Sequence, residues 1–294
     1  MPADADPRPA LQQLAEDRAA GASEIAESAR GHLARLPEAL PADEAAAGAR
    51  EAALALVRGH PAMAPIVHLA HETLTILDED GPAGLAALPR EPPLARQVAN
   101  QARPAIADAG TVLTYTRSGT VLAALELALE ATELRVLTSE ARPGDEGLAV
   151  ADALAHAGAD VTVTYDAHLP ALVDEAALVV VGADAITAEA IVNKAGTRPL
   201  FARAQETDTP VHVLASRDKL WPTELPRGPQ AGPEADWQPA VPDGVDVRAP
   251  LFEPTPLALV DAVVTEQGRC PPAELAGSLA DVCVHPTVQR ALEA

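Results

Sequence analysis

An alternation of strand-like and helix-like segments in the second half of the chain limits the possible folds more than any other feature. From Thr111 onward, five short runs rich in β-branched residues are separated by stretches with a helical pattern. These runs are residues 111–116, 134–139, 161–165, 178–181 and 211–215. The intervening helical stretches include 121–131, 147–157 and 198–206, each long enough to cross over a sheet face between parallel strands. The pattern predicts an α/β fold with a Rossmann-like parallel sheet.

A different pattern fills the first third of the chain. Between Pro9 and about residue 107, apolar residues recur at three- and four-residue spacings, interrupted by proline and glycine. We therefore expect an N-terminal helical domain, 1–107, and a Rossmann-like domain, 108–294, that carries the ligand cleft. Residues 221–244 contain six prolines and no regular period, which predicts an irregular surface segment.

Charge and composition exclude several classes of function. The net charge of −22 would repel a phosphate backbone, so direct binding of nucleic acid is not expected. The chain has no apolar run of membrane-spanning length and its first residues do not resemble a secretory signal, which favours a cytoplasmic protein without membrane contact. Its two cysteines, Cys270 and Cys283, are too few for a disulfide framework or a thiolate zinc site. No metal or cofactor is expected.

The basic residues are unusual, because 19 of the 21 are arginines and only Lys194 and Lys219 are lysines. A large excess of carboxylates keeps a protein soluble where salt screens their repulsion, so we interpret this surface as halophilic. This skew makes each of the two lysines a candidate for a specific role.

The residues that follow the predicted strands are candidates for a site, because ligands of open parallel sheets bind beyond the carboxyl ends of the strands. These residues are 115–119, 140–143, Asp166, 182–184 and 216–219. We expect their polar groups to converge on one cleft.

Several of these segments resemble motifs of one family. The segments are VLTYTRSG at 112–119, TSEARP at 138–143 with Gly147, VVGAD at 180–184, VNKAGT at 192–197, FEPTP at 252–256, TEQG at 265–268 and GAS at 21–23. Together they resemble the translation initiation factor 2B α/β/δ subunits and the related ribose-1,5-bisphosphate and methylthioribose-1-phosphate isomerases. The resemblance implies a helical N-terminal domain before a Rossmann-like one, and an oligomer formed with a second copy, with related subunits or with an initiation factor.

The resemblance also implies roles for individual residues. The isomerases use an aspartate and a cysteine to move a proton between C1 and C2 of an aldose phosphate. Here the aspartate position holds Asp184 and the cysteine position holds Thr116, so these two are the candidate catalytic residues. The candidate ligand-binding residues are Gly21, Ala22, Ser118, Gly119, Arg142, Asn193, Lys194 and Lys219.

Some departures from the family pattern favour a protein without catalysis. An alcohol ionises far less readily than a thiol unless a positioned base activates it, and the sequence near Thr116 shows no such base. Two arginines expected to hold phosphate are replaced by Ala20 and His60, and His60 is better explained as a structural residue. Our first hypothesis is therefore a regulatory, non-catalytic subunit-like protein that binds a sugar phosphate or nucleotide.

Two other hypotheses stay open. One is an active aldose–ketose isomerase acting on ribose 1,5-bisphosphate or a similar sugar 1-phosphate. The other is a protein-interaction scaffold with an inactive cleft. Simpler local roles also exist: Asp184 could cap the turn that follows it, Arg142 could fix its loop through Glu140 or Glu146, and Lys194 could be an incidental survivor.

Overall fold

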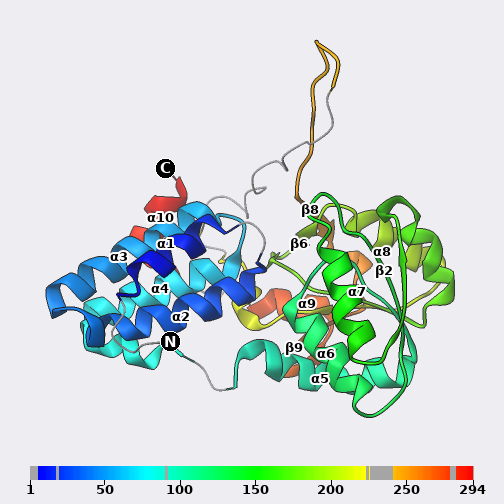
Figure 1. Ribbon diagram of the computed structural model, residues 1–294, viewed down its shortest axis with the longest axis horizontal. Helices are drawn as coiled ribbons and strands as arrows, with labels where there is room; N and C mark the ends of the chain where they lie inside the picture. Colours follow the sequence, from blue (N-terminus) through cyan, green and yellow to red (C-terminus); the bar gives the residue numbers. More distant parts are fainter. Residues whose placement is uncertain are drawn as a thin grey trace.

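The structure is a computed structural model that describes residues 6–17, 20–89, 92–222, 225, 241–278 and 283–293. A helical bundle lies beside a domain built on a mostly parallel sheet, as Figure 1 shows. This arrangement confirms the predicted α/β class with a helical N-terminal region. Residues 223–224 and 226–240, in the segment predicted to be irregular, lie outside the described residues.

The N-terminal bundle forms because each helix has one apolar face. Its elements are α1 (Arg8–Glu16), α2 (Ala22–Ala39), α3 (Ala42–Gly59), α4 (Ala64–Glu79) and the 3₁₀ segment η1 (Pro82–Ala87). In α2, Ile25, Ala29, Leu33 and Leu36 follow helical spacing and have no exposed surface. They pack in one cluster with the apolar faces of α3 and α4.

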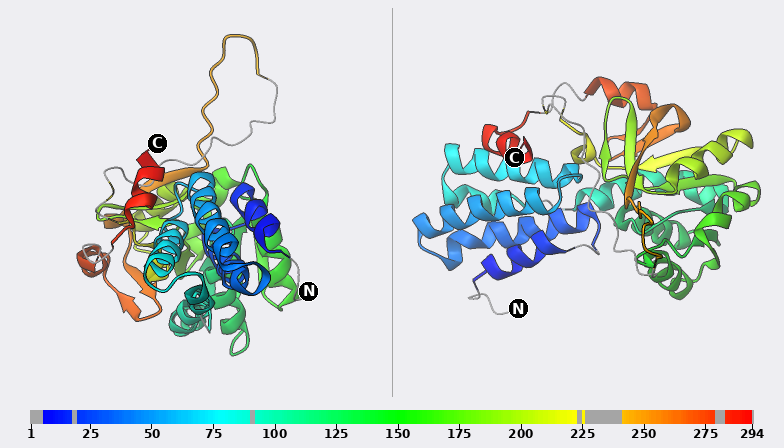
Figure 2. Two further views of the ribbon diagram at one scale, coloured as in Figure 1. Left: turned by 90° about the vertical axis from the view of Figure 1, so that its left-hand side faces the viewer. Right: turned by 90° about the horizontal axis from the view of Figure 1, so that it is seen from above.

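The chain returns to this bundle at its C-terminal end. Helix α10 (Pro286–Glu293) lies against the bundle in both views of Figure 2, and its Val288 is fully buried in the bundle core. His285 adds a contact to Asp78, with 3.1 Å between its Nε2 and a carboxylate oxygen.

The five predicted strands are adjacent in a seven-stranded sheet, in the order β10-β9-β7-β4-β1-β2-β3, with β3 at one edge and the two additional strands at the other. Six of these strands are parallel and β10 is antiparallel to β9. The predicted strands are β1 (Thr111–Leu113), β2 (Arg135–Ser139), β3 (Asp160–Thr164), β4 (Leu178–Val181) and β7 (Val211–Leu214). The sequence interpretation did not include β9 (Ala262–Thr265) and β10 (Gly268–Cys270).

Helices cover both faces of this sheet. One face packs against α5 (Leu94–Ala109), α6 (Gly119–Leu129) and α7 (Glu146–His156). The other packs against η2 (Asp166–Glu175), α8 (Thr197–Glu206), the 3₁₀ turn η4 (Leu257–Leu259) and α9 (Pro272–Gly277). Neighbouring strand residues such as Val179 and Val180 enter opposite core clusters, which explains why the central strands are continuous apolar runs.

A second, antiparallel sheet stands between the parallel sheet and the bundle. It consists of β5 (Ala185–Ile186), β6 (Ala190–Lys194) and β8 (Phe252–Pro256), in the order β5-β6-β8. Ala185 and Val192 from this sheet pack into the core of the bundle, whereas Ile186 and Ile191 pack into the core of the sheet domain. The small sheet therefore joins the two cores.

The position of α5 bears on the domain boundary expected at 107/108. Val98, Ala99, Ala102 and Ile106 of α5 pack with strand residues of the large sheet. We therefore propose that the boundary lies before α5 rather than within its last turn.

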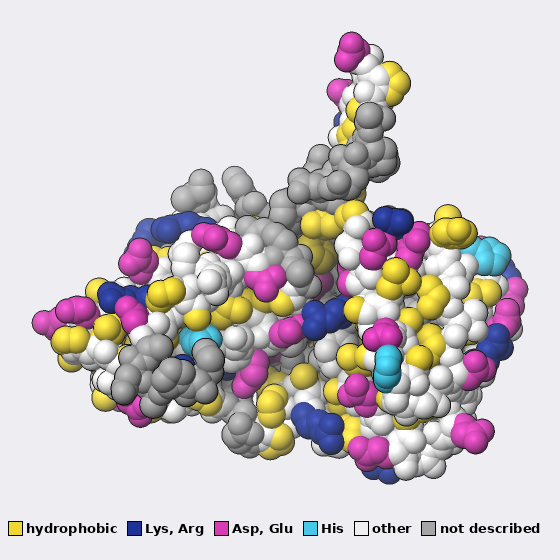
Figure 3. All heavy atoms as spheres, in the orientation of Figure 1, with side chains coloured by type: hydrophobic (Ala, Val, Ile, Leu, Met, Phe, Trp, Pro, Cys, Tyr) yellow, Lys and Arg dark blue, Asp and Glu magenta, His cyan; other side chains and the backbone are white. Residues whose placement is uncertain are grey.

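The surface and the helices add two observations. On the face shown in Figure 3, acidic side chains are scattered over both domains and basic side chains occur as separate spots rather than as a continuous stripe. Within the described part of the chain, no helix combines the length and the apolar character needed to cross a bilayer.

Candidate functional site

The candidate site lies where the strand order of the large sheet reverses. Strand β1 has β2 on one side and β4 on the other, and the chain moves outward from β1 to β2 and β3 before it returns to β4. The general rule for open parallel sheets places a ligand crevice at such a point, beyond the carboxyl ends of the strands. We call the region around the loops that follow β1 and β4 the crevice. Thr116 and Ser118 follow β1, and Gly182 and Asp184 follow β4.

The loop after β1 holds Thr116 in an uncommon conformation. Its φ is 63°, in the left-handed region that β-branched residues rarely adopt, and only 8% of the residue is exposed. The preceding Tyr115 anchors the loop, because its hydroxyl donates to the carbonyl oxygen of Ala195 at 2.6 Å. Burial also raises the pKa of the Tyr115 phenol, so it remains a donor at neutral pH.

Ser118 and Gly182 bring the two loops into contact. Ser118 is the N-cap of α6, and its Oγ accepts a long hydrogen bond of 3.4 Å from the Val121 amide. A Cβ added at Gly182 would lie 2.5 Å from that oxygen. The close approach requires glycine at this position. It places the predicted ligand residue Ser118, and Gly119 beside it, against the chain that leads to Asp184.

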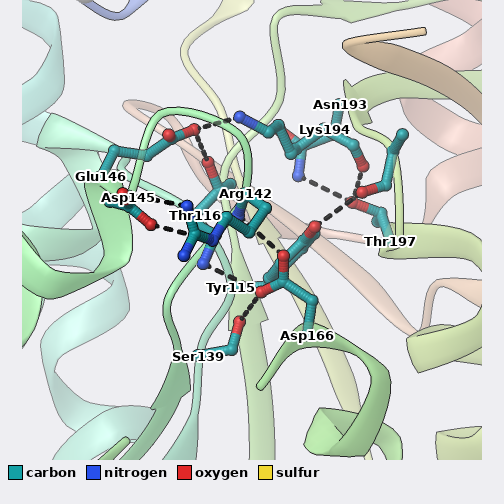
Figure 4. A network of polar contacts seen from close by, with 12 residues as sticks. Tyr115, Thr116, Ser139, Arg142, Asp145, Glu146, Asp166, Asn193, Lys194 and Thr197 are labelled. Carbon is teal, nitrogen blue, oxygen red and sulfur yellow. Dashed lines mark hydrogen bonds and ion pairs between the residues drawn. The ribbon is translucent and has the colours of Figure 1, made fainter. Parts of the chain in front are cut away.

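Thr116, Glu146 and Lys194 form a polar network at the mouth of the crevice, drawn in Figure 4. The Thr116 hydroxyl donates to Glu146 Oε1 at 3.0 Å. Lys194 Nζ lies 2.5 Å from the same oxygen, and the Lys194 side chain is only 8% exposed. Glu146 is the first residue of α7, whose next residue, Gly147, lies against the Ser139 carbonyl with no room for a Cβ. The carboxylate is therefore held in place by tight packing of its helix.

Asp184 and Lys219 lie in the same site, since each is electrostatically coupled to the other. Burial raises the pKa of Asp184 above its usual 3.8, although Lys219 and Lys194 act in the opposite direction. Burial lowers the pKa of Lys219, and Asp184 and Asp218 oppose that shift. Lys219 is 5% exposed, and its ammonium has no hydrogen-bond or ion-pair partner among the described residues.

Asp166 fixes the loop after β2. Its carboxylate accepts from the Ser139 hydroxyl at 2.6 Å and from the amides of Ala141 and Arg142 at 2.8 and 2.7 Å. The Arg142 guanidinium points outward, with a side chain that is 63% exposed and pairs with Asp145 at 3.2 Å and Glu140 at 3.6 Å. The contact with Glu140 agrees with the loop-fixing interpretation of Arg142, and Asp145 is an additional partner.

Asn193 is directed into the protein rather than into open solvent. Its side-chain nitrogen donates to Thr197 Oγ1 at 3.1 Å, and Thr197 in turn donates to the Lys194 carbonyl at 2.7 Å. Glu253 closes the turn by accepting from the amides of Gly196 and Arg198 at 2.8 and 2.9 Å. These contacts fix the direction in which Lys194 leaves β6.

The N-terminal bundle forms another wall of the site. Its Ala64 amide donates to the Asp184 carbonyl at 3.1 Å, and His68 Nε2 lies 2.7 Å from the Leu220 carbonyl. At the start of α2, Gly21 is the N-cap, Ala22 is buried, and Glu24 pairs with Arg117 at 2.8 Å.

The positions predicted to have lost an arginine have local roles in the bundle. The Ala20 amide donates to Asp17 Oδ1 at 3.0 Å. His60 is buried, with its Nε2 2.8 Å from the Leu14 carbonyl, a contact that ties α1 to the end of α3.

Glu146 is the site residue whose role at Thr116 the sequence did not indicate. The sequence indicates Glu146 only as a possible partner of Arg142, and a glutamate in the first turn of a helix is ordinarily explained by the helix dipole. Its place directly before Gly147 in the resembling motif is the signal that could have identified it.

Comparison with known proteins gives one family. The family model described as "Initiation factor 2 subunit family" matches residues 93–272. A ribose 1,5-bisphosphate isomerase of Methanocaldococcus jannaschii is 34% identical over 177 residues, which is 57% of this chain and 56% of the isomerase, so this chain spans little more than half the length of that relative.

Two other comparisons cover nearly the whole chain. A protein of Pyrococcus horikoshii named as translation initiation factor eIF-2B subunit 2-like is 30% identical over 88% of this chain and 94% of its own length. The crystal structure of translation initiation factor eIF-2B from Pyrococcus horikoshii OT3 superposes with a TM-score of 0.76 at 28% identity, and covers 90% of this chain and 96% of that one.

Proposed function

The chain belongs to the initiation factor 2 subunit family, and from this premise we propose that its cleft binds a phosphorylated sugar or nucleotide without converting it, in a regulatory role. The family fold does not decide between binding and catalysis, because one fold can carry both. The choice therefore depends on the groups at the crevice.

The observation that carries the proposal is the hydrogen bond from Thr116 to a carboxylate that is already paired. Isomerisation of an aldose phosphate moves a proton between adjacent carbons, and the groups that move it need a pKa near the working pH. The position expected to supply a thiol holds an alcohol instead, and that alcohol donates to a carboxylate that is already paired with Lys194. A glutamate engaged by an ammonium at 2.5 Å is poorly placed to activate the hydroxyl.

Binding of a phosphate is supported by Lys219. Its ammonium is buried and has no ion-pair partner among the described residues. Asp184 and Asp218 offset only part of the cost of desolvation, since the pKa of Lys219 is still lowered, and an anion from solution would offset more of it. Lysine offers a compact charge with rotatable donors, which suits a phosphate. The N-terminus of α6, at Ser118 and Gly119, can donate backbone N–H groups to the same anion.

The isomerase hypothesis remains the second candidate, because one observation favours it. The raised pKa of Asp184 gives a carboxyl group that can hold a proton nearer to neutral pH than an ordinary aspartate. In that account Asp184 would transfer the proton, Lys194 and Lys219 would hold phosphate, and Glu146 would have to act as the base that activates Thr116.

Calorimetric titration in molar KCl tests the proposed binding. Ribose 5-phosphate and AMP are the probes, with Lys219→Met as the variant and Arg135→Ala as the control. Arg135 lies at the opposite end of β2, in an exposed ion pair with Glu175. We expect Lys219→Met to weaken binding about 30-fold or more, the cost of removing a buried charged partner, and Arg135→Ala to bind as the wild type does. Equal affinity of Lys219→Met and the wild type would contradict the proposal, and no binding by any of the proteins would favour the scaffold hypothesis.

Assembly is a separate part of the proposal. The sequence resemblance to initiation factor subunits implies a second copy or related subunits as partners. Sedimentation velocity of the purified chain in molar KCl would show a dimer or larger species, and a monomer at all concentrations would argue against self-assembly.

A further inference from the structure

We propose that Glu146 selects a ligand with a single phosphate, because it pairs with Lys194 and leaves Lys219 as the buried lysine of the crevice that has no ion-pair partner among the described residues. This inference rests on the proposed function and specifies the ligand class that the site takes.

The pairing of the basic side chains is the first step of the argument. Five basic side chains follow the strand ends, and three of them have acidic partners within hydrogen-bonding or ion-pair distance. The pairs are Lys194 with Glu146 at 2.5 Å, Arg117 with Glu24 at 2.8 Å, and Arg142 with Asp145 at 3.2 Å and Glu140 at 3.6 Å. The other two are Arg217 and Lys219. Arg217 is half-buried and lies 3.5 Å from the side-chain oxygen of Gln267. Lys219 is buried and has no ion-pair partner within the described part of the chain, although Asp184 and Asp218 attract it electrostatically.

The position of Glu146 is the second step. Asp184 is coupled electrostatically to Lys219, Lys194 and Glu146, so all four groups belong to one site. The Glu146 side chain is 22% exposed and begins a helix that packs tightly on the end of β2. It therefore cannot move away as freely as a surface glutamate when a second anion approaches.

The third step compares the groups that a ligand meets at Lys219 with those that it meets at Glu146 and Lys194. A phosphate monoester needs one compensating cation, which Lys219 supplies. A bisphosphate brings a second dianion that would compete with Glu146 for Lys194 and would meet the repulsion of its carboxylate. Sugar hydroxyls, in contrast, can donate to the Glu146 carboxylate and to the Thr116 oxygen, whose own hydrogen is donated to Glu146. The geometry therefore fits one phosphate at Lys219 and neutral hydroxyls at Glu146.

The test compares two probes, ribose 5-phosphate and ribose 1,5-bisphosphate, by calorimetric titration in molar KCl. The proteins are the wild type, Glu146→Gln, Lys194→Met and the control Glu175→Gln, which removes one carboxylate from an exposed ion pair at the other end of the sheet. The measured quantity is the ratio of the two dissociation constants, which a general loss of folding would not shift. Circular dichroism verifies that each variant is folded.

We expect the wild type to bind ribose 5-phosphate at least as tightly as the bisphosphate. Glu146→Gln moves the ratio about tenfold toward the bisphosphate, equivalent to about 1.4 kcal/mol. Lys194→Met moves it in the opposite direction, because it leaves the Glu146 charge uncompensated, and Glu175→Gln leaves it unchanged.

Two results would overturn the inference while the proposed binding function stands. One is tenfold tighter binding of the bisphosphate by the wild type, and the other is an unchanged ratio in both Glu146→Gln and Lys194→Met. Failure of the wild type to bind either probe would overturn the proposed function itself.

Discussion

A substitution at Gly182 tests the contact that brings the loops after β1 and β4 together. An alanine Cβ at this position would lie 2.5 Å from Ser118 Oγ and 2.8 Å from Ser118 Cβ, which is closer than real Cβ atoms approach other heavy atoms. Either the serine rotates and loses its capping bond to Val121, or the two loops separate. We expect Gly182→Ala to lower the free energy of unfolding by about 1–3 kcal/mol, the usual cost of overpacking.

A double-mutant cycle isolates this contact from any other effect of the alanine. Ser118→Gly removes both atoms of the clash, and glycine is a tolerable N-cap, so alone it costs only a few tenths of a kcal/mol. The double variant Ser118→Gly/Gly182→Ala is therefore expected to be nearly as stable as Ser118→Gly, with a coupling energy of about 1–3 kcal/mol.

The assay for the cycle is urea denaturation followed by circular dichroism in molar KCl, with the wild type and both single variants measured together. Wild-type stability of Gly182→Ala, or strictly additive effects in the double variant, would refute the proposed close contact.

Three further predictions concern charge and loop order. Burial raises the pKa of Asp184, so this residue contributes most to stability when the pH is below its pKa in the unfolded chain, near 3.8, and the contribution is lost as the pH rises through its pKa in the folded protein. We therefore expect Asp184→Asn to be more stable than the wild type at neutral pH. A melting temperature of Asp184→Asn below that of the wild type at neutral pH would contradict this. Asp166→Ala removes an acceptor shared by Ser139, Ala141 and Arg142, so we expect a loss of about 2–4 kcal/mol in urea denaturation and faster amide exchange in residues 139–142, with unchanged exchange as the contrary result. The net charge of −22 is expected to make the unfolding temperature rise as KCl increases from dilute to molar concentrations, and a melting temperature independent of salt would oppose the halophilic interpretation.

Much of the sheet domain could be predicted from the sequence because its signals are local. The five predicted strands are short β-branched runs, and the helices between them are long enough to be recognised from their own segments of sequence. The carboxyl ends of parallel strands share an edge of the sheet, so residues that follow different strands, such as Thr116, Ser118 and Asp184, could be expected near one crevice. The family could be identified because its motifs lie in these same loops.

The features that escaped prediction depend on distant parts of the chain. Strand β6 is paired with β8, and residues 190–194 lie about sixty residues before 252–256, so neither segment shows its partner locally. Helix α5 has an apolar face that would look the same against the bundle or the sheet. The role of Glu146 depends on Thr116 and Lys194, which lie 30 and 48 residues away.

Phosphorus NMR of ribose 1,5-bisphosphate mixed with the purified protein in molar KCl tests the central claim most directly, since one spectrum reports both binding and turnover. A cleft that binds without catalysis predicts broadening of the substrate lines, loss of that broadening in Lys219→Met, and no ribulose 1,5-bisphosphate after prolonged incubation. Steady formation of ribulose 1,5-bisphosphate by the wild type, abolished in Asp184→Asn, would contradict the claim and show that the site remains an isomerase with Thr116 in place of cysteine.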